Sequence, residues 1–443
     1  MANNLLARVV WRMSLPIIFV EATETLDHLI ATLFLARVGV IELGAIAVAD
    51  SVILLFLIVP LGLVDGMQIL MARRVGQRLP AAVGAVFNQG MLLVLALCAV
   101  ATLTLELCSS VAARALVQSA GVGQAMNSYL QIEACRIPLA GLTFACGALL
   151  ISLGRTRALV PATIILVATD VPLTYALVFG KWGLPALGMR GAAFGAIGAE
   201  LATAIFLVIY VSRQFGGKGY GLFNFRWSDG RITRLLGRLS WPIVAQRFVV
   251  DIRWFVFFLI IERIGASALA LANIVYTCYI VLFIPAEGFA ETVCSMVSRL
   301  VGSNRPQRIG EVVRSTIGCA ILVTGPFLLL ALAAPQWVLA LFTGLSDESL
   351  QSNACLRVAA MTMFVAIPAH MWFTAVEGTG DTAAALAIDL ALTVVTLGLT
   401  YVAAIHLAWP MGLIWLAVPI GWLVCLTASY GWIKSGIWKR LEV

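Results

Sequence analysis

The sequence has little charge. Charged residues make up only 12% of its 443 positions, about half of the roughly 25% that is usual in soluble domains. With 61% hydrophobic residues, the chain has too few polar groups to cover a water-soluble globule and too many apolar groups for a disordered chain. The apolar residues come in runs of about twenty, the length of an α-helix that crosses a bilayer. Such runs exclude a membrane β-barrel, because barrel strands alternate apolar and polar residues.

Cysteine and histidine are few and follow no pattern typical of chemistry. Nine cysteines lie scattered in apolar segments, no CxxC pair occurs, and none of the 3 histidines is at ligand spacing from a cysteine. We therefore expect buried thiols, with no disulfide and no metal site. HExxH, GxSxG and P-loop motifs are also missing. This argues against an enzyme, a cofactor and an ATP-driven pump.

We predict an all-α integral membrane protein with twelve transmembrane helices. The predicted spans are 14–36, 44–71, 84–107, 130–152, 160–180, 190–212, 240–262, 267–298, 314–342, 352–377, 386–406 and 411–432. Arg8 and Arg12 precede the first span, as they would in a signal peptide. That span contains Glu21, Glu24 and Asp27 and no small-residue cleavage site, so we expect it to stay uncleaved.

The distribution of basic residues predicts the orientation. Of the 29 lysines and arginines, three fall inside spans and six lie on one side of the predicted membrane, whereas all others lie on the opposite side. The six are Arg37, Arg114, Lys181, Arg190, Arg263 and Arg357. Basic loops face the cytoplasm, so both termini are predicted to be cytoplasmic. The basic residues are spread over several segments and do not form one patch, which argues against a nucleic-acid partner.

An internal repeat relates the two halves at an offset of 226 residues. Arg12, Ser14 and Pro16 fall on Arg238, Ser240 and Pro242, and the register persists to Gly154 and Thr156, which fall on Gly380 and Thr382. We therefore predict two pseudo-symmetric six-helix bundles, 1–212 and 239–443, joined by a cytoplasmic linker at 213–238. Because six is even, the bundles are parallel repeats, an arrangement typical of transporters that alternate access to a central site. A scaffold or receptor without transport is the alternative.

The motifs resemble the multidrug and toxic compound extrusion (MATE) family. The resemblance rests on Ser14-Leu15-Pro16 and Ser240-Trp241-Pro242, on the segments 36–39 and 72–76, on Leu187 to Ala193, and on Gly378-Thr379-Gly380-Asp381-Thr382. It covers essentially the whole chain. It implies a cation-coupled exporter with two lobes, driven by a proton or sodium gradient.

The chain departs from the family where coupling is expected. Many members carry an acid at the position of Ala31, whereas here Asp27 lies one turn earlier on the same helix face. The family's Asn and Asp in the fifth helix are here Asp170 and Thr174, and an acid of the seventh helix is displaced from Val250 to Asp251. The family's coupling residues therefore do not carry over directly.

Ionisable residues inside spans are costly and predict the functional site. Glu21, Glu24, Asp27 and His28 share one face of the first helix, and Arg247, Asp251 and Arg253 lie in the seventh. The two helices are repeat mates, so we expect a face of acids opposite a face of arginines across a cleft. These groups form either a proton-linked switch or static ion pairs.

Further acids and histidines give secondary candidates. Asp170 and Asp389 look like isolated acids in apolar surroundings and favour a functional role, with Arg136 a possible partner. Glu200 and Glu287 could serve in hydrogen-bonded packing. His370 and His406 have no apparent partner and are interpreted as structural.

We predict a secondary active exporter that exchanges protons, in preference to sodium, for an amphipathic small molecule. The alternative is a flippase for a lipid-linked or anionic amphiphile, because Arg136, Arg247 and Arg253 keep an anionic substrate open. We expect a multi-pass monomer in the plasma (bacterial inner) membrane, surrounded by membrane lipid.

Overall fold

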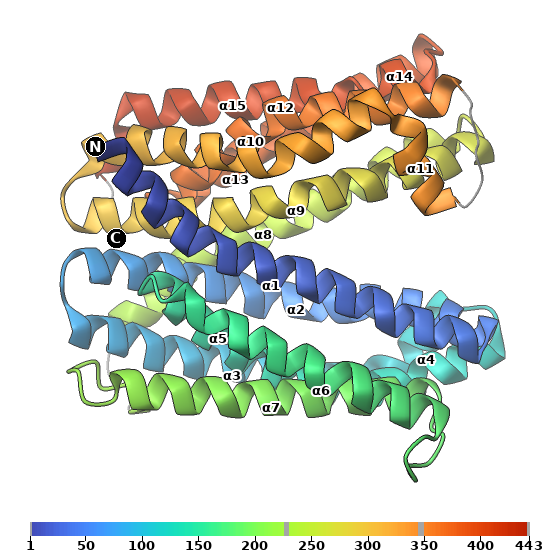
Figure 1. The fold of residues 1–443 in the computed structure, drawn as a ribbon, viewed down its shortest axis with the longest axis horizontal. Helices are drawn as coiled ribbons and strands as arrows, with labels where there is room; N and C mark the ends of the chain where they lie inside the picture. The colour runs from blue at the N-terminus through green and yellow to red at the C-terminus, as the bar shows by residue number, and fades with distance from the viewer. Residues whose placement is uncertain (1, 226–229, 344–349, 441–443) are drawn as a thin grey trace. The chain divides into compact units, whose positions relative to one another are not determined.

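All regular structure in the described residues is helical (Figure 1). The computed structural model describes residues 2–225, 230–343 and 350–440. In hydrocarbon, a backbone N–H or C=O without a partner costs several kcal/mol, and a helix satisfies these groups within one segment. The all-α prediction is confirmed.

Fifteen α-helices follow one another in the described residues. The first seven are α1 (Ala2–Val38), α2 (Val40–Gly76), α3 (Pro80–Leu116), α4 (Ala120–Glu133), α5 (Ile137–Ser152), α6 (Leu159–Phe179) and α7 (Met189–Phe215). The others are α8 (Gly230–Glu262), α9 (Ala266–Gly302), α10 (Ile309–Ala333), α11 (Pro335–Thr343), α12 (Leu350–Gly378), α13 (Thr382–Tyr401), α14 (Met411–Ile414) and α15 (Ala417–Ser435). Short helical turns connect them: η1 (Ala134–Arg136), η2 (Thr156–Ala158), η3 (Pro306–Arg308), η4 (Val402–His406) and η5 (Ile437–Arg440).

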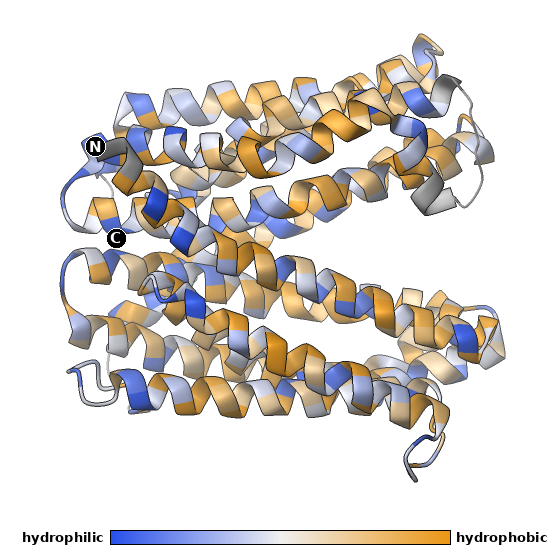
Figure 2. Cartoon of the chain, in the orientation of Figure 1, coloured by the Kyte–Doolittle hydropathy of each residue, from blue (hydrophilic) through white to orange (hydrophobic). Residues whose placement is uncertain are grey.

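Ten helical stretches of the described chain are long and apolar enough to cross a membrane. They include composite spans, such as Ala120–Ser152, which joins α4, η1 and α5. The long helices α1 and α8, with 37 and 33 residues, carry several intramembrane charges and complete a set of twelve. Hydrophobic residues predominate along the helices, and hydrophilic ones are more frequent near the connections (Figure 2).

Several predicted ends are wrong by up to ten residues. The fourth span begins at Ala120 rather than at 130, and the ninth runs from Pro306 to Ala333 rather than from 314 to 342. The ninth span ends early because α10 stops at Ala333 and a separate short helix, α11, begins at Pro335. The early starts have another reason, which is that helices continue past the hydrocarbon. A 37-residue helix rises about 55 Å, whereas the hydrocarbon core is about 30 Å thick.

The chain packs as two compact units. One unit comprises Phe19–Val244, and the other comprises Met1–Ile18 together with Ala245–Val443. We call them the acidic unit and the paired unit, after the charges described below. The boundaries fall inside α1 and α8. The first part of α1 packs with the paired unit and the rest with the acidic unit, whereas the first part of α8 packs with the acidic unit and the rest with the paired unit.

Two repeat-related glycines allow these crossings. A Cβ on Gly62 of α2 would lie 2.5 Å from a methyl carbon of Val244, within the acidic unit. A Cβ on Gly288 of α9 would lie 2.6 Å from a side-chain carbon of Ile18, within the paired unit. Small residues at helix crossings let backbones approach closely in membranes. The same close approach therefore occurs in both units, where α9 crosses α1 near Ile18 and where α2 crosses α8 near Val244.

The core of the paired unit is built from large apolar side chains. Trp415, Phe257 and Phe289 are fully buried there. The beginning of α1 and the end of α15 lie at the same end of this unit (Figure 1), as an even number of spans requires.

Candidate functional site

A break in the fourth span brings an arginine into the acidic unit. The turn η1, Ala134–Arg136, interrupts the helical path between α4 and α5. Pro138 follows in the first turn of α5, where its missing N–H and fixed φ are tolerated, although they prevent continuation of an upstream α-helix. The break directs Arg136 toward acids from two other elements.

Arg136 holds two buried carboxylates. Its Nε donates to Oε1 of Glu133, and its Nη1 lies 3.4 Å from Oε2 of Glu200 on α7. The hydroxyl of Thr143 donates to the other oxygen of Glu200 at 2.5 Å. Glu133 and Glu200 are only 2% and 7% exposed. One guanidinium therefore serves two acids, which leaves an excess of negative charge.

Asp27 and Asp170 lie in the same unit as Arg136, Glu133 and Glu200, and we call these five residues the acid cluster. The carboxyl groups of Asp27 and Asp170 lie in hydrogen-bonding contact, and the Thr174 hydroxyl donates to Oδ1 of Asp170 at 3.0 Å. No N–H or O–H group of the described residues donates to the buried Oδ1 of Asp27. Ionised carboxylates only accept hydrogen bonds. A hydrogen bond between these two side chains therefore requires that one of them carries a proton.

Close packing of α6 against α7 fixes this geometry. A Cβ on Gly195 would overlap the hydroxyl oxygen of Thr174, and one on Gly191 would lie 2.6 Å from the carbonyl carbon of Leu177. The two glycines thus bring α6 onto α7. Asp170 and Thr174 lie one turn apart on α6 and are both buried.

The remaining residues of the first-helix face extend the cluster. Glu24 interacts electrostatically with Glu21, Glu200 and Arg136. Nε2 of His28 lies 3.7 Å from a carboxylate oxygen of Asp50 on α2. The structure therefore brings Asp27 and Asp170, predicted separately from sequence, to one place.

The paired unit has a buried ion pair. Arg253 of α8 donates to Oδ1 of Asp389 on α13 at 2.8 Å and to the hydroxyl of Thr393 at 3.2 Å. Arg253 and Asp389 are 7% and 5% exposed. The interpretation of Asp389 as an isolated acid was wrong, because its partner is 136 residues away in the chain. Arg136, suggested as a partner of Asp170 or Asp389, forms its ion pairs with Glu133 and Glu200 instead, and it acts on Asp170 only electrostatically.

Arg247 and Asp251 lie one turn apart on α8 and attract each other electrostatically. Arg247 also acts on Glu287 of α9. Asp251 and Glu287, the two acids on which Arg247 acts, both belong to the paired unit. The expected opposition of first-helix acids and seventh-helix arginines across a cleft stays a prediction.

A second pair in the paired unit joins α12 to α9. Nε2 of His370 lies 3.1 Å from Oε2 of Glu287. The His370 ring also packs against Phe283 and Trp422, with centroids 5.1 and 5.9 Å apart. The interpretation of His370 as lacking a partner was wrong. Glu200 and Glu287 are both hydrogen-bonded, which was one of the two interpretations left open by the sequence.

Glu133 and Asp50 were missed from the sequence. Glu133 precedes Arg136 by three residues, a spacing that places two side chains on the same helix face. That signal was available. Asp50 offered none, because its partner His28 lies on another helix.

The MatE family model matches residues 16–176 and 242–402, one match in each half. The chain belongs to this family. Members of the MatE family are membrane transporters and not enzymes, and they use ion gradients instead of a cofactor. Two separate matches also agree with the internal repeat.

Several bacterial relatives support the assignment. A probable multidrug resistance protein NorM of Aromatoleum aromaticum is 27% identical over 81% of this chain and 76% of its own length. A probable multidrug resistance protein YoeA of Bacillus subtilis is 21% identical over 98% of this chain and 95% of its own length.

The fold agrees with solved MatE structures. A MATE crystal structure in the bent conformation superposes with a TM-score of 0.88 at 16% identity, over 98% of this chain and 97% of that one. A transporter from Pyrococcus furiosus, described as having a binding pocket of reverse polarity that suggests a different function, gives a TM-score of 0.86 at 16% identity, over 97% of this chain and 95% of that one. At these identities the likeness concerns the fold alone.

Proposed function

We propose that this MatE transporter exports amphipathic small molecules in exchange for protons, and that Asp27 and Asp170 carry the exchanged proton. The supporting observation is the contact between their carboxyl groups, which needs a proton to become a hydrogen bond. When the proton leaves, two negative charges repel each other at close range in a low-dielectric interior. Deprotonation therefore favours a different arrangement of α1 against α6.

The rest of the acidic unit suits this role. Arg136 makes its ion pairs with Glu133 and Glu200 and acts on Asp27 and Asp170 only through space, so one cation faces four acids and cannot neutralise all of them. Asp170 is held by Thr174 on a helix that packs tightly on α7, whereas Asp27 belongs to α1, which runs from one unit into the other. We propose that proton release is transmitted along α1 and alternates the access of the substrate site.

The proposal includes the setting of the transporter. Relatives named as probable multidrug resistance proteins are bacterial, which supports drug-like substrates and the bacterial inner membrane. The bias in basic residues supports cytoplasmic termini. The repeat supports two homologous bundles, 1–212 and 239–443, with the linker 213–238, in a protein that acts as a monomer.

A flippase for an anionic or lipid-linked amphiphile is the second candidate. It is favoured by Arg247, whose cationic side chain lies inside α8 and is partly exposed. A cationic wall attracts an anionic substrate and repels a cationic one.

Transport in proteoliposomes tests the proposal. Purified protein would be reconstituted and given a proton gradient or a sodium gradient, with cationic and anionic fluorescent substrates. We expect export of cationic substrates driven by the proton gradient alone. Sodium dependence would reject the proton, and selective movement of anionic amphiphiles would favour the flippase.

Substitutions then test the site. Asp27→Asn and Asp170→Asn should each lower proton-driven export at least tenfold, because a neutral amide of the same shape cannot release a proton. Glu262→Gln removes an exposed acid at the end of α8 and should leave export unchanged. If both aspartate variants export at the unsubstituted rate, this coupling site is wrong.

A further inference from the structure

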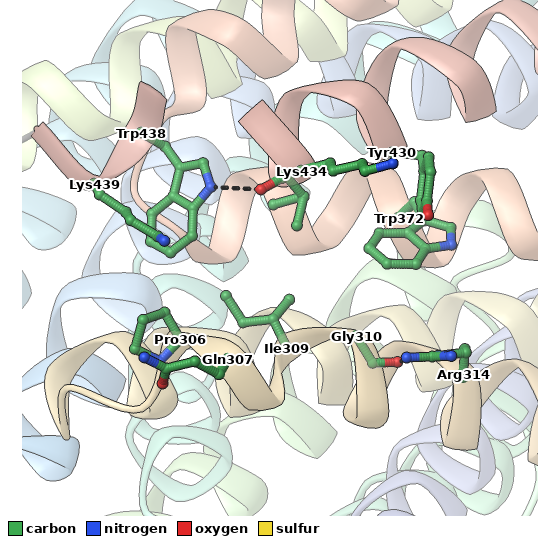
Figure 3. A pocket seen from close by; sticks show the side chains of 11 residues that line it. Pro306, Gln307, Ile309, Gly310, Arg314, Trp372, Tyr430, Lys434, Trp438 and Lys439 are labelled. Carbon is green, nitrogen blue, oxygen red and sulfur yellow. Dashed lines mark hydrogen bonds between the residues drawn. The ribbon is translucent and has the colours of Figure 1, made fainter. Parts of the chain in front are cut away.

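The paired unit contains a pocket that none of the charged residues described above lines. It has a volume of about 380 Å³ and opens between α10, α12, α15 and η5 (Figure 3). This size lies within the range of about 300–1,000 Å³ that small-molecule sites occupy. Its lining includes three cationic and three aromatic side chains: Arg314, Lys434, Lys439, Trp372, Tyr430 and Trp438.

The pocket lies where spans meet the membrane surface. Pro306, which lines it, begins one span, and Lys434 lies next to Ser435, which ends another. Lipid phosphates occupy this level of a bilayer, and Trp and Tyr are enriched there. The predicted orientation places this end at the cytoplasmic leaflet, whose anionic lipids attract basic residues.

The walls of the pocket are fixed by contacts within the protein. The Trp438 indole donates to the carbonyl of Ile433 at 3.2 Å, and the rings of Trp372 and Tyr430 pack edge-on with centroids 5.0 Å apart. Gly436 adopts a left-handed conformation (φ 70°), in which glycine is favoured. That turn returns the chain so that the Lys439 ammonium lies 5.8 Å from the Trp438 ring.

The same place in the acidic unit is filled by the protein's own chain. Gly84 of α3 is the repeat mate of Gly310 of α10, and a Cβ on Gly84 would overlap the carbonyl oxygen of Tyr220. Asn88 donates to the carbonyl of Gly221 and accepts from the N–H of Phe223, both at 2.7 Å. The segment after α7 therefore covers this face of α3.

In the paired unit, Arg314 stands at the position of Asn88 and Gly310 at that of Gly84. A Cβ on Gly310 would meet only Arg314 and Trp372, at 3.4 and 3.9 Å. Among the described residues, both side chains line the open pocket and no backbone segment covers them. At equivalent positions of the repeat, the Asn88 amide binds the protein's own backbone, whereas the Arg314 guanidinium is exposed. A guanidinium is a group that binds phosphate.

We propose that this pocket binds the phosphate headgroup of an acidic phospholipid. Arg314, Lys434 and Lys439 would contact the phosphate, and Trp372, Tyr430 and Trp438 would line the glycerol and the first methylene groups. The acid nearest in sequence to the lining, Glu311, accepts from Arg308 at 3.2 Å. The pocket therefore keeps its net positive charge. Basic pockets between transmembrane helices are known to bind such headgroups.

Binding to the purified full-length protein tests the assignment. Thermal unfolding and native mass spectrometry would be measured in detergent with short-chain phosphatidylglycerol, with phosphatidylcholine and with inorganic phosphate alone. We expect phosphatidylglycerol to bind and stabilise the protein more than the other two. Equal effects of inorganic phosphate would assign the pocket to a free anion and overturn the lipid proposal.

Charge and shape can be removed separately. The triple variant Arg314→Gln, Lys434→Gln, Lys439→Gln should bind phosphatidylglycerol on the order of 100-fold more weakly, because each basic contact contributes about fivefold. Arg155→Gln, Arg157→Gln, Arg213→Gln removes three exposed charges from the acidic unit and should retain binding. Full binding by the first triple variant would overturn the proposal.

A variant that fills the pocket provides a second test in case the triple variant does not fold. Gly310→Leu fills the pocket without removing a charge and should also abolish the preference for phosphatidylglycerol. Gly318→Leu lies two turns further along α10 and faces open space, so it should bind like the unsubstituted protein. Retained lipid preference in Gly310→Leu would show that the lipid binds elsewhere.

Discussion

The two units share a repeat but treat buried charge differently. In the acidic unit, Arg136 serves both Glu133 and Glu200, and Asp27 touches Asp170. In the paired unit, Arg253 serves Asp389 and His370 serves Glu287, one partner for each acid. An excess of acids needs protons to be stable in low dielectric, whereas the Arg253–Asp389 pair is already neutralised by a permanent cation. This difference is the basis of our proposal that the acidic unit carries the exchanged proton.

The backbone devices, by contrast, are shared by both units. Gly62 and Gly288 play the same part at the crossings of α2 with α8 and of α9 with α1. Pro16 and Pro242 lie inside α1 and α8 at equivalent positions. The two halves therefore share their helix packing but differ in their charged side chains.

The largest expected effect comes from removing the shared arginine. Arg136→Gln leaves Glu133 and Glu200 buried without their cation, and breaking a buried pair costs about 3–5 kcal/mol. We expect a strongly lowered unfolding temperature in detergent. Adding Glu133→Gln and Glu200→Gln should restore much of it. If Arg136→Gln alone unfolds like the unsubstituted protein, the acids do not depend on this residue.

Removal of the Arg253–Asp389 pair is the corresponding change in the paired unit. Arg253→Met with Asp389→Leu removes both members of one pair, and such double replacements are often neutral or stabilising by up to about 4 kcal/mol. We expect unchanged or higher thermal stability and retained proton-driven export of a cationic dye. Loss of export with intact folding would assign coupling to this unit as well.

Gly62→Ala and Gly288→Ala test whether the two crossings are equivalent. Each added methyl group overlaps a side chain of the crossing helix, and overpacking costs about 1–3 kcal/mol. The two variants should lower the unfolding temperature by similar amounts. Gly217→Ala, at a position with open space, is the control. A large effect in one variant only would break the symmetry of the crossings.

The smallest expected effect concerns a helix start. Asp381 accepts from the N–H of Ala384 at 3.2 Å and from the Trp432 indole at 3.0 Å, whereas its repeat mate Arg155 makes no capping bond. Asp381→Ala should cost about 1 kcal/mol, a typical value for a lost N-cap. Arg155→Ala should cost nearly nothing. Equal unfolding temperatures for the two variants would contradict the difference.

Hydropathy, the repeat and helix-face spacing predicted a large part of the molecule. The helical class and the placing of Glu24 and Asp27 on one face followed from apolar runs and a 3.6-residue period. The span ends did not, because a helix continues past the bilayer without a change in hydropathy. Neither did the partner of Asp389, because the spacing within one helix says nothing about which side chain of another helix lies opposite.

Apolar runs and the repeat are enough to make this protein a two-fold repeated helical membrane protein with costly charges inside its spans. Lack of water in the bilayer enforces helices, and a repeated sequence enforces a repeated packing. Which of these charges meet depends on how the helices pack in three dimensions. Asp27 and Asp170 lie on helices 143 residues apart in sequence, and their contact arises because glycines on α7 draw α6 close while α1 crosses from one unit to the other. Pairing of this kind depends on the distance between helices in space, which no local pattern of residues encodes.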